Sequence, residues 1–215
     1  MKKIGLLLIG LTITIFANGQ IVKVQGGISI SKLDWRVSTF NGGLYDKTLI
    51  GYSLFAGIDY FDKQYFNLSS NIGMVRKGGK DEVQYFDQFG SPLGTLIVKP
   101  TLDYLSINTT IDFKYRIKKT IIPFIGLGPR FDYLLNASRH FDGLKELDEL
   151  KSISIGLILG GGLKYEISNL QFGLRADYYL DFTKIANWTI EDSGVEGKVS
   201  VNTFTINLSI GYRLK

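Results

Sequence analysis

The sequence predicts an all-β protein, a single eight-stranded antiparallel up-and-down transmembrane β-barrel. Segments of alternating apolar and polar residues recur from residue 21 to residue 214, and their connections alternate between short polar turns and long loops. The chain also opens on a segment typical of secretion signals. Only helices and closed barrels satisfy every backbone polar group in lipid, and no apolar stretch after residue 20 is long enough for a helical span. A closed barrel is therefore the membrane structure that this sequence favours.

Residues 1–19 have the pattern of a cleaved signal peptide. Lys2 and Lys3 form a basic region, an apolar run follows at residues 4–16, and Ala17 and Gly19 are small residues at the positions that signal peptidase reads. The apolar run is shorter than the roughly 20 residues of a spanning helix. We expect cleavage after Gly19 and a barrel domain at residues 20–215. Without the two lysines the formal net charge falls from +5 to +3.

Composition excludes several classes of protein. The chain has no cysteine, so it carries no disulfide, no thiol nucleophile and no cysteine-linked lipid anchor. Its charges are scattered rather than gathered in a basic block, so we expect no nucleic-acid partner. The aromatic fraction of 13% and the 25 glycines fit a β protein with aromatic rims and tight turns.

Eight strands are predicted, each at least as long as the 9–11 residues that a tilted transmembrane strand needs. They are residues 21–33, 48–61, 65–76, 102–117, 121–136, 152–167, 170–183 and 199–214. Short turns are expected at 62–64, 118–120 and 168–169, and long loops at 34–47, 77–101, 137–151 and 184–198. Outer-membrane barrels place short turns in the periplasm and long loops outside the cell. We expect the last strand to pair with the first and close the barrel.

Alternation assigns an apolar, lipid-facing side to most strands. The outward sets are the alternate residues of 50–60, 105–115, 153–165, 170–182 and 204–214. Two strands fit less well, because Ser70 and Arg76 fall on an outward face and Pro129 lies in mid-strand, where proline cannot donate to the ladder. Gly126 and Gly128 beside Pro129 predict a β-bulge there. An aromatic girdle is expected at the short-turn end, formed by Tyr60, Phe66, Tyr115, Phe124, Tyr165, Phe172 and Tyr212.

The opposite side of the strands is polar and nearly balanced in charge. Its members are Asp59, Asn67, Asn71, Asn108, Asp112, Lys114, Arg116, Arg130, Asp132, Lys164, Glu166, Arg175, Asp177, Asp181, Asn207 and Arg213. The interior of an eight-stranded barrel is just wide enough for side chains to fill. We therefore expect these residues to pair and close the lumen rather than to line an open pore.

Three segments carry a resemblance to a known family. Residues 102–107 (LDYLSI), 123–130 (PFIGLGPR) and 207–215 (NLSIGYRLK) resemble strands of the porT-like outer-membrane β-barrel proteins. The resemblance implies an eight-stranded barrel in the outer membrane of a Gram-negative bacterium. Most members have no assigned activity, and one branch is linked to protein secretion across the outer membrane. The last residue here is Lys215, not the terminal aromatic residue common in better-known barrels.

The residues that suggest a reaction or a bound ion lie in the loop after the fifth strand and in one glycine run. His140, the only histidine, lies near Ser138 and Asp142, which keeps a lipid-modifying hydrolase open although a solvated loop histidine is the preferred interpretation. The glycine run 160–162 lies inside a strand, so it is expected to bend that strand or to admit a bulky lumen side chain. An acidic group in the loop suits either calcium or a short helical cap at 143–150. Its members are Asp142, Glu146, Asp148 and Glu149.

The sequence therefore predicts a non-enzymatic outer-membrane barrel that is monomeric and acts as a structural or interaction platform. Outer-membrane lipid is one expected partner, and a protein bound through the long loops is another. We assign no catalytic, cofactor-binding or metal-binding residue. The alternatives are an outer-membrane lipid-modifying enzyme, a small-solute pore and a soluble lipocalin-like carrier. Aromatic loop residues suit partner binding or contact with lipid headgroups: Trp35, Tyr45, Tyr85, Phe86, Phe89 and Trp188.

Overall fold

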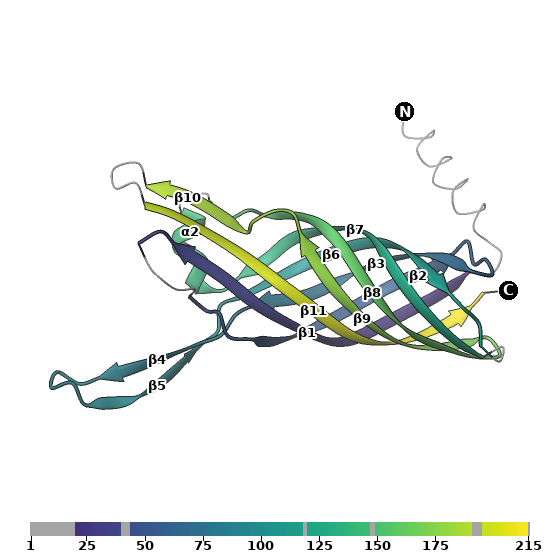
Figure 1. Ribbon diagram of the computed structural model, residues 1–215, viewed down its shortest axis with the longest axis horizontal. Coiled ribbons are helices and arrows are strands. Elements are labelled where there is room, and N and C mark those ends of the chain that lie inside the picture. Colours follow the sequence, from purple (N-terminus) through teal and green to yellow (C-terminus); the bar gives the residue numbers. More distant parts are fainter. Residues whose placement is uncertain (1–19, 40–43, 118–119, 147–148, 191–194, 215) are drawn as a thin grey trace.

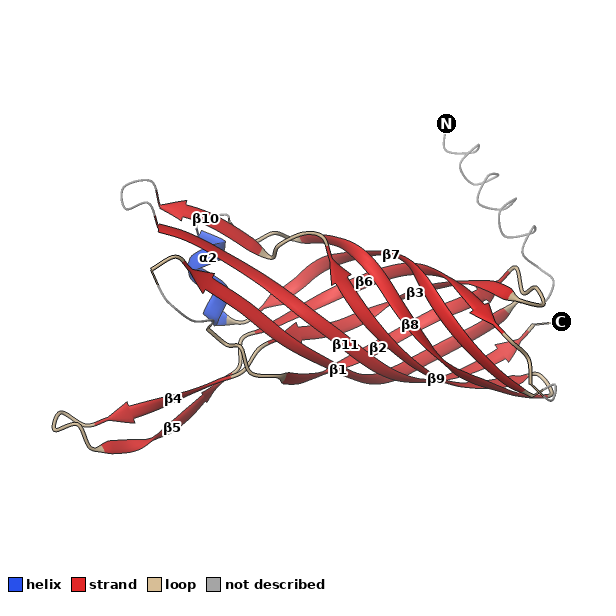
Figure 2. Cartoon of the chain, in the orientation of Figure 1, coloured by secondary structure: helices blue, strands red, loops and turns tan. Residues whose placement is uncertain are grey.

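The computed structural model describes residues 20–39, 44–117, 120–146, 149–190 and 195–214. The predicted signal peptide, residues 1–19, lies outside the described residues. The described elements are drawn in Figures 1 and 2. They are β1 (Ile21–Val37), β2 (Leu49–Tyr60), β3 (Phe66–Gly78), β4 (Asp81–Phe86), β5 (Pro92–Val98), β6 (Thr101–Lys114), β7 (Ile121–Ala137), η1 (Arg139–Phe141), α2 (Asp142–Glu146), β8 (Ile153–Ile167), β9 (Leu170–Asp181), β10 (Ala186–Ile190) and β11 (Val195–Arg213).

Eight of these strands form a closed antiparallel barrel. The order around the wall is β1-β2-β3-β6-β7-β8-β9-β11, and β11 pairs back onto β1. The closing register runs from Ile21 opposite Arg213 to Val37 opposite Gly197. The predicted pairing of the last strand with the first is therefore confirmed, together with the eight-stranded meander. Figure 1 shows the strands inclined to the long axis of the barrel, with the short turns at one end and the long loops at the other.

Three strands lie in segments that were expected to be loops. β4 and β5 pair with each other as a hairpin, and β10 pairs with the outer part of β11. The hairpin leaves the long-loop end of the barrel and projects beyond it (Figure 1). These strands lie beyond the lipid-facing band, so their sequences need not repeat its apolar alternation. For that reason the alternation used to predict the barrel strands does not predict them.

The predicted bulge at Pro129 is wrong. The register between β6 and β7 is the same on both sides of the proline, with Asn108 opposite Arg130 and Ile111 opposite Leu127. Since proline has no N–H, the ladder loses a hydrogen bond at this point without gaining an extra residue. The register shift between these strands falls instead beside Asp103, closer to the long-loop end.

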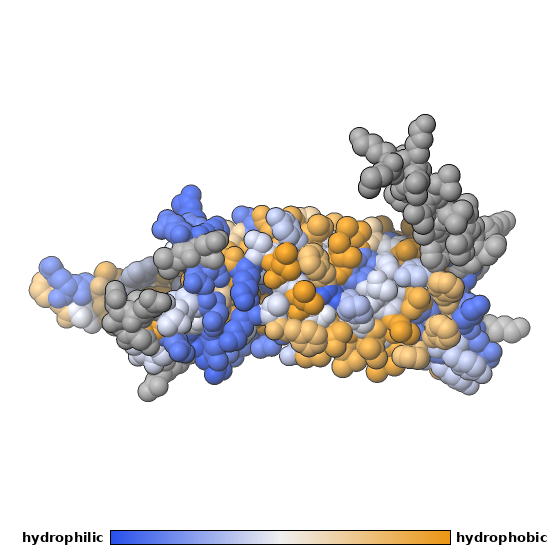
Figure 3. Space-filling model, turned by 90° about the horizontal axis from the view of Figure 1, so that it is seen from above, coloured by the Kyte–Doolittle hydropathy of each residue, from blue (hydrophilic) through white to orange (hydrophobic). Residues whose placement is uncertain are grey.

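The outside of the barrel carries an apolar band, and on the face drawn in Figure 3 orange atoms gather over the middle part of the barrel. Side chains from the predicted outward sets stay exposed there, including Ile50 at 68% and Leu208 at 67%. The outward Arg76 donates hydrogen bonds of 2.7 and 2.8 Å to Asp103, so its charge is paired. No helix among the described residues has the length and apolar character needed to cross a bilayer.

One member of the predicted aromatic girdle points the other way. Phe124 is only 8% exposed and faces the lumen, where its ring lies 4.9 Å from the Lys164 Nζ atom. The alternation of β7 places Ile125 outside instead, at 60% exposure. The prediction that Phe124 belongs to the outward aromatic girdle is therefore wrong, because the alternation of β7 places it on the lumen side. Phe66, Tyr115, Tyr165, Phe172 and Tyr212 are exposed as expected.

Candidate functional site

A six-residue ion-pair cluster fills the half of the lumen nearer the short turns. Lys23 Nζ lies 2.5 Å from Asp59, and Lys164 Nζ lies 2.8 Å from the other oxygen of the same carboxylate. Lys164 also reaches Asp112 at 3.4 Å. Arg175 completes the chain, because its guanidinium lies 2.9 Å from Asp112 and 2.7 Å from Asp177. Three cations thus face three carboxylates, and strands β1, β2, β6, β8 and β9 are connected across the interior.

A four-residue ion-pair cluster lies further toward the long loops. Lys77 Nζ is 2.7 Å from Asp132 and 3.5 Å from Asp181, and Arg130 pairs with both carboxylates. All four side chains are almost fully buried. The Tyr179 ring packs against the Arg130 guanidinium, with 4.2 Å between the guanidinium carbon and the ring centroid. This cluster is also neutral, with two cations and two carboxylates.

Amide side chains occupy the layer between the clusters. Gln25 donates to Asn71 at 2.7 Å, and Asn71 donates to Asn108 at 2.9 Å. Two small cavities in this region have volumes of about 10 Å³ each, which is room for about one water molecule. Among the described residues, the lumen is therefore filled by paired side chains, and a solute would have to displace them to pass.

Glycine residues in the neighbouring strands β7 and β8 make room for the charged side chains of the lumen. Gly126 and Gly160 lie opposite each other in the sheet. A Cβ atom at Gly160 would lie 1.9 Å from an Asp177 carboxylate oxygen, and one at Gly126 would lie 2.2 Å from an Asp112 oxygen. Gly160 of the 160–162 run therefore admits a lumen side chain, but that side chain is the small carboxylate of Asp177 and not a bulky one.

A plug, residues 139–146, lies at the long-loop end of the barrel and comprises η1 and α2. Phe141 is fully buried and Leu144 is 7% exposed, and both join the apolar cluster at this end of the lumen. The Phe141 ring stacks on Trp35 with 5.5 Å between centroids. The predicted helical cap is present as the short helix α2. This half of the lumen is more apolar than the predicted set of inward residues indicates.

Phe141→Ala is expected to destabilise the folded barrel by about 3–5 kcal/mol, because the substitution leaves a cavity where a large buried ring was. The variant is nevertheless expected to stay silent in a planar bilayer, since both ion-pair clusters still fill the lumen beneath the plug. Urea titration and single-channel recording measure the two effects. Steady conductance from this variant would contradict a lumen sealed by its own charged residues.

The side chains suggested for hydrolysis lie on the surface of the plug and do not form a triad. The His140 Nδ1 atom lies 3.3 Å from the Ser138 hydroxyl, but Asp142 pairs with Lys145 at 3.0 Å. The hydrogen bond between His140 and Ser138 is exposed, and neither residue lines either of the two small lumen cavities described above. Of the suggested calcium ligands, Asp148 lies outside the described residues. The described residues contain no group of three or more potential metal ligands.

The loop aromatics divide into two groups. Trp35, Tyr45 and Trp188 are partly buried against the apolar cluster around the plug, which leaves less of their surface for the expected contact with a partner or with lipid headgroups. The other three lie on the β4–β5 hairpin and are exposed: Tyr85 at 47%, Phe86 at 56% and Phe89 at 83%. Among the long-loop residues that the structure describes, exposed aromatic surface is therefore concentrated on the hairpin.

The hairpin is apolar on both faces. Val83 lies opposite Leu96 on one face, while Phe86 and Ile97 lie on the other, and all four are exposed. Its base is held by charge, because Lys47 and Lys80 lie 3.2 and 3.0 Å from Glu82. Hydrogen bonds from these two lysines hold the pKa of the Glu82 carboxyl below its ordinary value. The structure thus presents a paired β-ribbon whose apolar residues have no intramolecular covering among the described residues.

A belt of ion pairs ties the short turns together. Asp62, in the β2–β3 turn, accepts hydrogen bonds from Lys114 and from Arg213, the latter at 2.9 Å. Glu166 accepts from Arg213 and Arg116, each at 2.7 Å. Burial by itself raises the pKa of Asp62, but the hydrogen bonds from Lys114 and Arg213 outweigh burial and lower the pKa below its ordinary 3.8.

Asp62→Asn is expected to cost about 1–2 kcal/mol of stability at neutral pH, because the Lys114 and Arg213 side chains lose their shared carboxylate. A carboxylate with a lowered folded-state pKa stabilises the fold fully above its unfolded pKa and loses that effect as pH falls through the folded value. The stability difference between wild type and variant should therefore be constant above about pH 5. It should shrink below pH 3.8. Urea titrations at several pH values measure it, and a difference that grows in acid would contradict the assignment.

Sequence reasoning missed two cations of the ion-pair clusters. Lys23 lies on β1, for which no outward set is predicted, and Lys77 falls in a predicted loop because the predicted third strand ends at residue 76, two residues before the end of β3. The signal was present in the alternation. Lys23 is two residues from the inward Gln25, and Lys77 continues the inward series of β3 after Val75. Tyr104 and Tyr179 also face the lumen, but they are absent from the predicted inward set because that set contains only charged and amide side chains.

Comparisons with known proteins agree with this architecture. A family model described as outer membrane protein beta-barrel domain matches residues 10–187. The crystal structure of the outer membrane protein OprG from Pseudomonas aeruginosa is 13% identical, covers 92% of this chain and 97% of its own, and superposes with a TM-score of 0.55. Neisserial surface protein A is 14% identical over 89% of this chain and 96% of its own, with a TM-score of 0.46. No curated protein matches the chain.

Proposed function

Because the chain belongs to the family of outer membrane protein β-barrel domains, we propose that it is a non-enzymatic barrel that binds a protein outside the cell through its β4–β5 hairpin. The outer-membrane location excludes the soluble lipocalin-like carrier. Export through a cleaved signal peptide at residues 1–19 and a monomeric barrel are part of the same proposal. We expect mass spectrometry of the mature protein to show an N-terminus at Gln20.

The observation that carries the proposal is the exposed apolar surface of the hairpin. Phe86, Phe89 and Leu93 are 56%, 83% and 70% exposed near its tip. An apolar surface displayed on a rigid support is typical of a protein-binding site, and aromatic side chains dominate the binding energy of such sites. Figure 1 shows the tip carried beyond the long-loop end of the barrel, whereas the apolar band lies over the barrel itself (Figure 3). Contact with the surrounding membrane is therefore the less favoured role for these aromatic residues.

The lumen supports a passive barrel rather than a pore or an enzyme. Its cations and carboxylates are used in pairing with one another, and the plug covers them from the long-loop end. A role accessory to secretion or to another cell-surface process, as in one branch of the porT-like proteins, is the finer form of this proposal. The hairpin would then contact a component of that machinery.

Site-specific photocrosslinking tests the proposal in intact cells. A photoreactive phenylalanine analogue at Phe89 is expected to give a discrete protein adduct, because this side chain is the most exposed of the hairpin aromatics. The matched control places the same analogue at Lys184, which is exposed at the same end of the barrel but outside the hairpin. Equal adducts from both positions, or none from Phe89 across growth conditions, would contradict a hairpin-centred binding site.

A further inference from the structure

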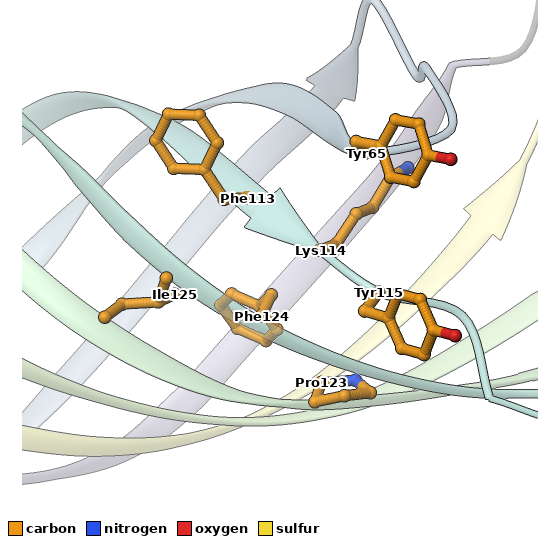
Figure 4. A pocket seen from close by; sticks show the side chains of 7 residues that line it. All are labelled: Tyr65, Phe113, Lys114, Tyr115, Pro123, Phe124 and Ile125. Atoms are coloured by element: carbon orange, nitrogen blue, oxygen red, sulfur yellow. The ribbon is translucent and has the colours of Figure 1, made fainter.

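A groove on the outer surface of the barrel lies at the short-turn end, between β6, β7 and the β2–β3 turn. Its volume is about 490 Å³, and its lining is almost entirely apolar and aromatic. Figure 4 shows Phe113 and Ile125 on the side nearer the middle of the barrel, and Tyr65 and Tyr115 on the side nearer the turns. All four side chains are at least half exposed. The groove therefore runs from the apolar band into the zone where the lipid headgroups begin.

The polar end of the groove is rich in cations. Lys114 lines it, Arg116 follows on the same strand end, and Lys63 is exposed in the turn that carries Tyr65. The belt of ion pairs brings Arg213 to the same end of the barrel, so three cations, Lys114, Arg116 and Arg213, share the two carboxylates Asp62 and Glu166, and Lys63 adds a further positive charge. The turn at Ser168–Asn169, by contrast, has no charged residue. Among the described residues of the short-turn end, the cations of this group therefore outnumber the carboxylates.

We propose that this groove binds one anionic phospholipid of the inner leaflet. An acyl chain would lie along Phe113 and Ile125, and the headgroup phosphate would lie at the polar end near Lys63 and the two tyrosine hydroxyls. Hydrocarbon is the surrounding medium at the apolar end, so a protein partner would gain no hydrophobic driving force there. The surplus of cations at the headgroup end favours an anionic lipid over a zwitterionic one, because basic clusters at membrane surfaces attract anionic headgroups.

Native mass spectrometry of the full barrel in detergent tests the proposal. The probes are phosphatidylglycerol and phosphatidylethanolamine with identical acyl chains. Wild type is expected to retain one phosphatidylglycerol in preference to phosphatidylethanolamine. Lys63→Gln should reduce that preference about fivefold, since a cation at a membrane surface contributes about 1 kcal/mol. Lys99→Gln, at an exposed position toward the long loops, is the matched control and should leave the preference unchanged.

Ile125→Trp provides a second test, because the larger ring fills the apolar end of the groove. This variant should lose both lipids while keeping its heat-modifiable mobility on gels, which reports the folded barrel. Equal retention of the two lipids by wild type, or no effect of Lys63→Gln, would overturn the proposal. A dimer retained in place of lipid and abolished by Ile125→Trp would assign the groove to a second copy of the chain and overturn it as well.

Discussion

Asp132→Ala is expected to destabilise the barrel by about 3–5 kcal/mol, because breaking a buried ion pair leaves an uncompensated charge in a low-dielectric interior. Asp132 is fully buried and pairs with Lys77 at 2.7 Å and with Arg130 at 3.0 Å. Without it both cations face Asp181 alone. Urea-induced unfolding of the barrel refolded into lipid vesicles, followed by gel mobility, measures the change.

A double variant separates the cost of an unpaired charge from the loss of the pair itself. In Lys77→Met/Asp132→Leu one cation and one carboxylate are removed together, so Arg130 and Asp181 remain as a neutral pair. Replacing a buried ion pair with apolar residues of similar volume is often neutral or stabilising. The double variant is therefore expected to be more stable than Asp132→Ala. A loss below about 1 kcal/mol in the single variant would indicate that water enters and screens the four-residue cluster.

Deletion of residues 204–215 is expected to abolish assembly of the barrel in the membrane. These residues include the part of β11 that pairs with both β1 and β9, from Phe204 to Tyr212. Their removal exposes two strand edges in lipid, where each unsatisfied backbone group costs several kcal/mol. The heat-modifiable gel shift of the folded barrel should disappear, and the chain should be found in the aggregated or degraded fraction.

Deletion of a similar length elsewhere is the control. Replacing residues 82–97, most of the β4–β5 hairpin, with a short Gly-Ser linker removes no strand of the barrel. This variant should fold, insert and show the same gel shift as wild type, while losing the crosslinked adduct of the hairpin. A 204–215 deletion that still inserts and resists heat would refute the closure of β11 on β1.

The barrel could be predicted from sequence because lipid imposes a strict rule on every strand. Alternate residues must be apolar where they face hydrocarbon, and Ile206, Leu208 and Ile210 show that rule directly. Loop length then gave the connectivity. The same rule explains the error at Phe124, since an aromatic residue at a strand end suits either face of the wall, and only the register of β7 decides between them.

The plug, the hairpin and the pairing of the charges could not be predicted in the same way. Phe141 and Trp35 are distant in sequence, and their stacking depends on how two loops fold over the barrel mouth. The partner of each charge depends on strand tilt and stagger, which bring Lys164 of β8 to Asp59 of β2 across the lumen. Alternation assigns residues to a face and carries no information on which inward side chains meet.

The orientation of the barrel, with the hairpin outside the cell and the short turns inside, is tested most directly by labelling single cysteines in intact cells. The chain has no cysteine, so each variant carries one reporter. A membrane-impermeant maleimide should label Phe89→Cys at the hairpin tip without cell disruption, and it should label Asn169→Cys in a short turn only after the outer membrane is opened. Labelling of Asn169→Cys but not Phe89→Cys in intact cells would contradict the proposed role of the hairpin.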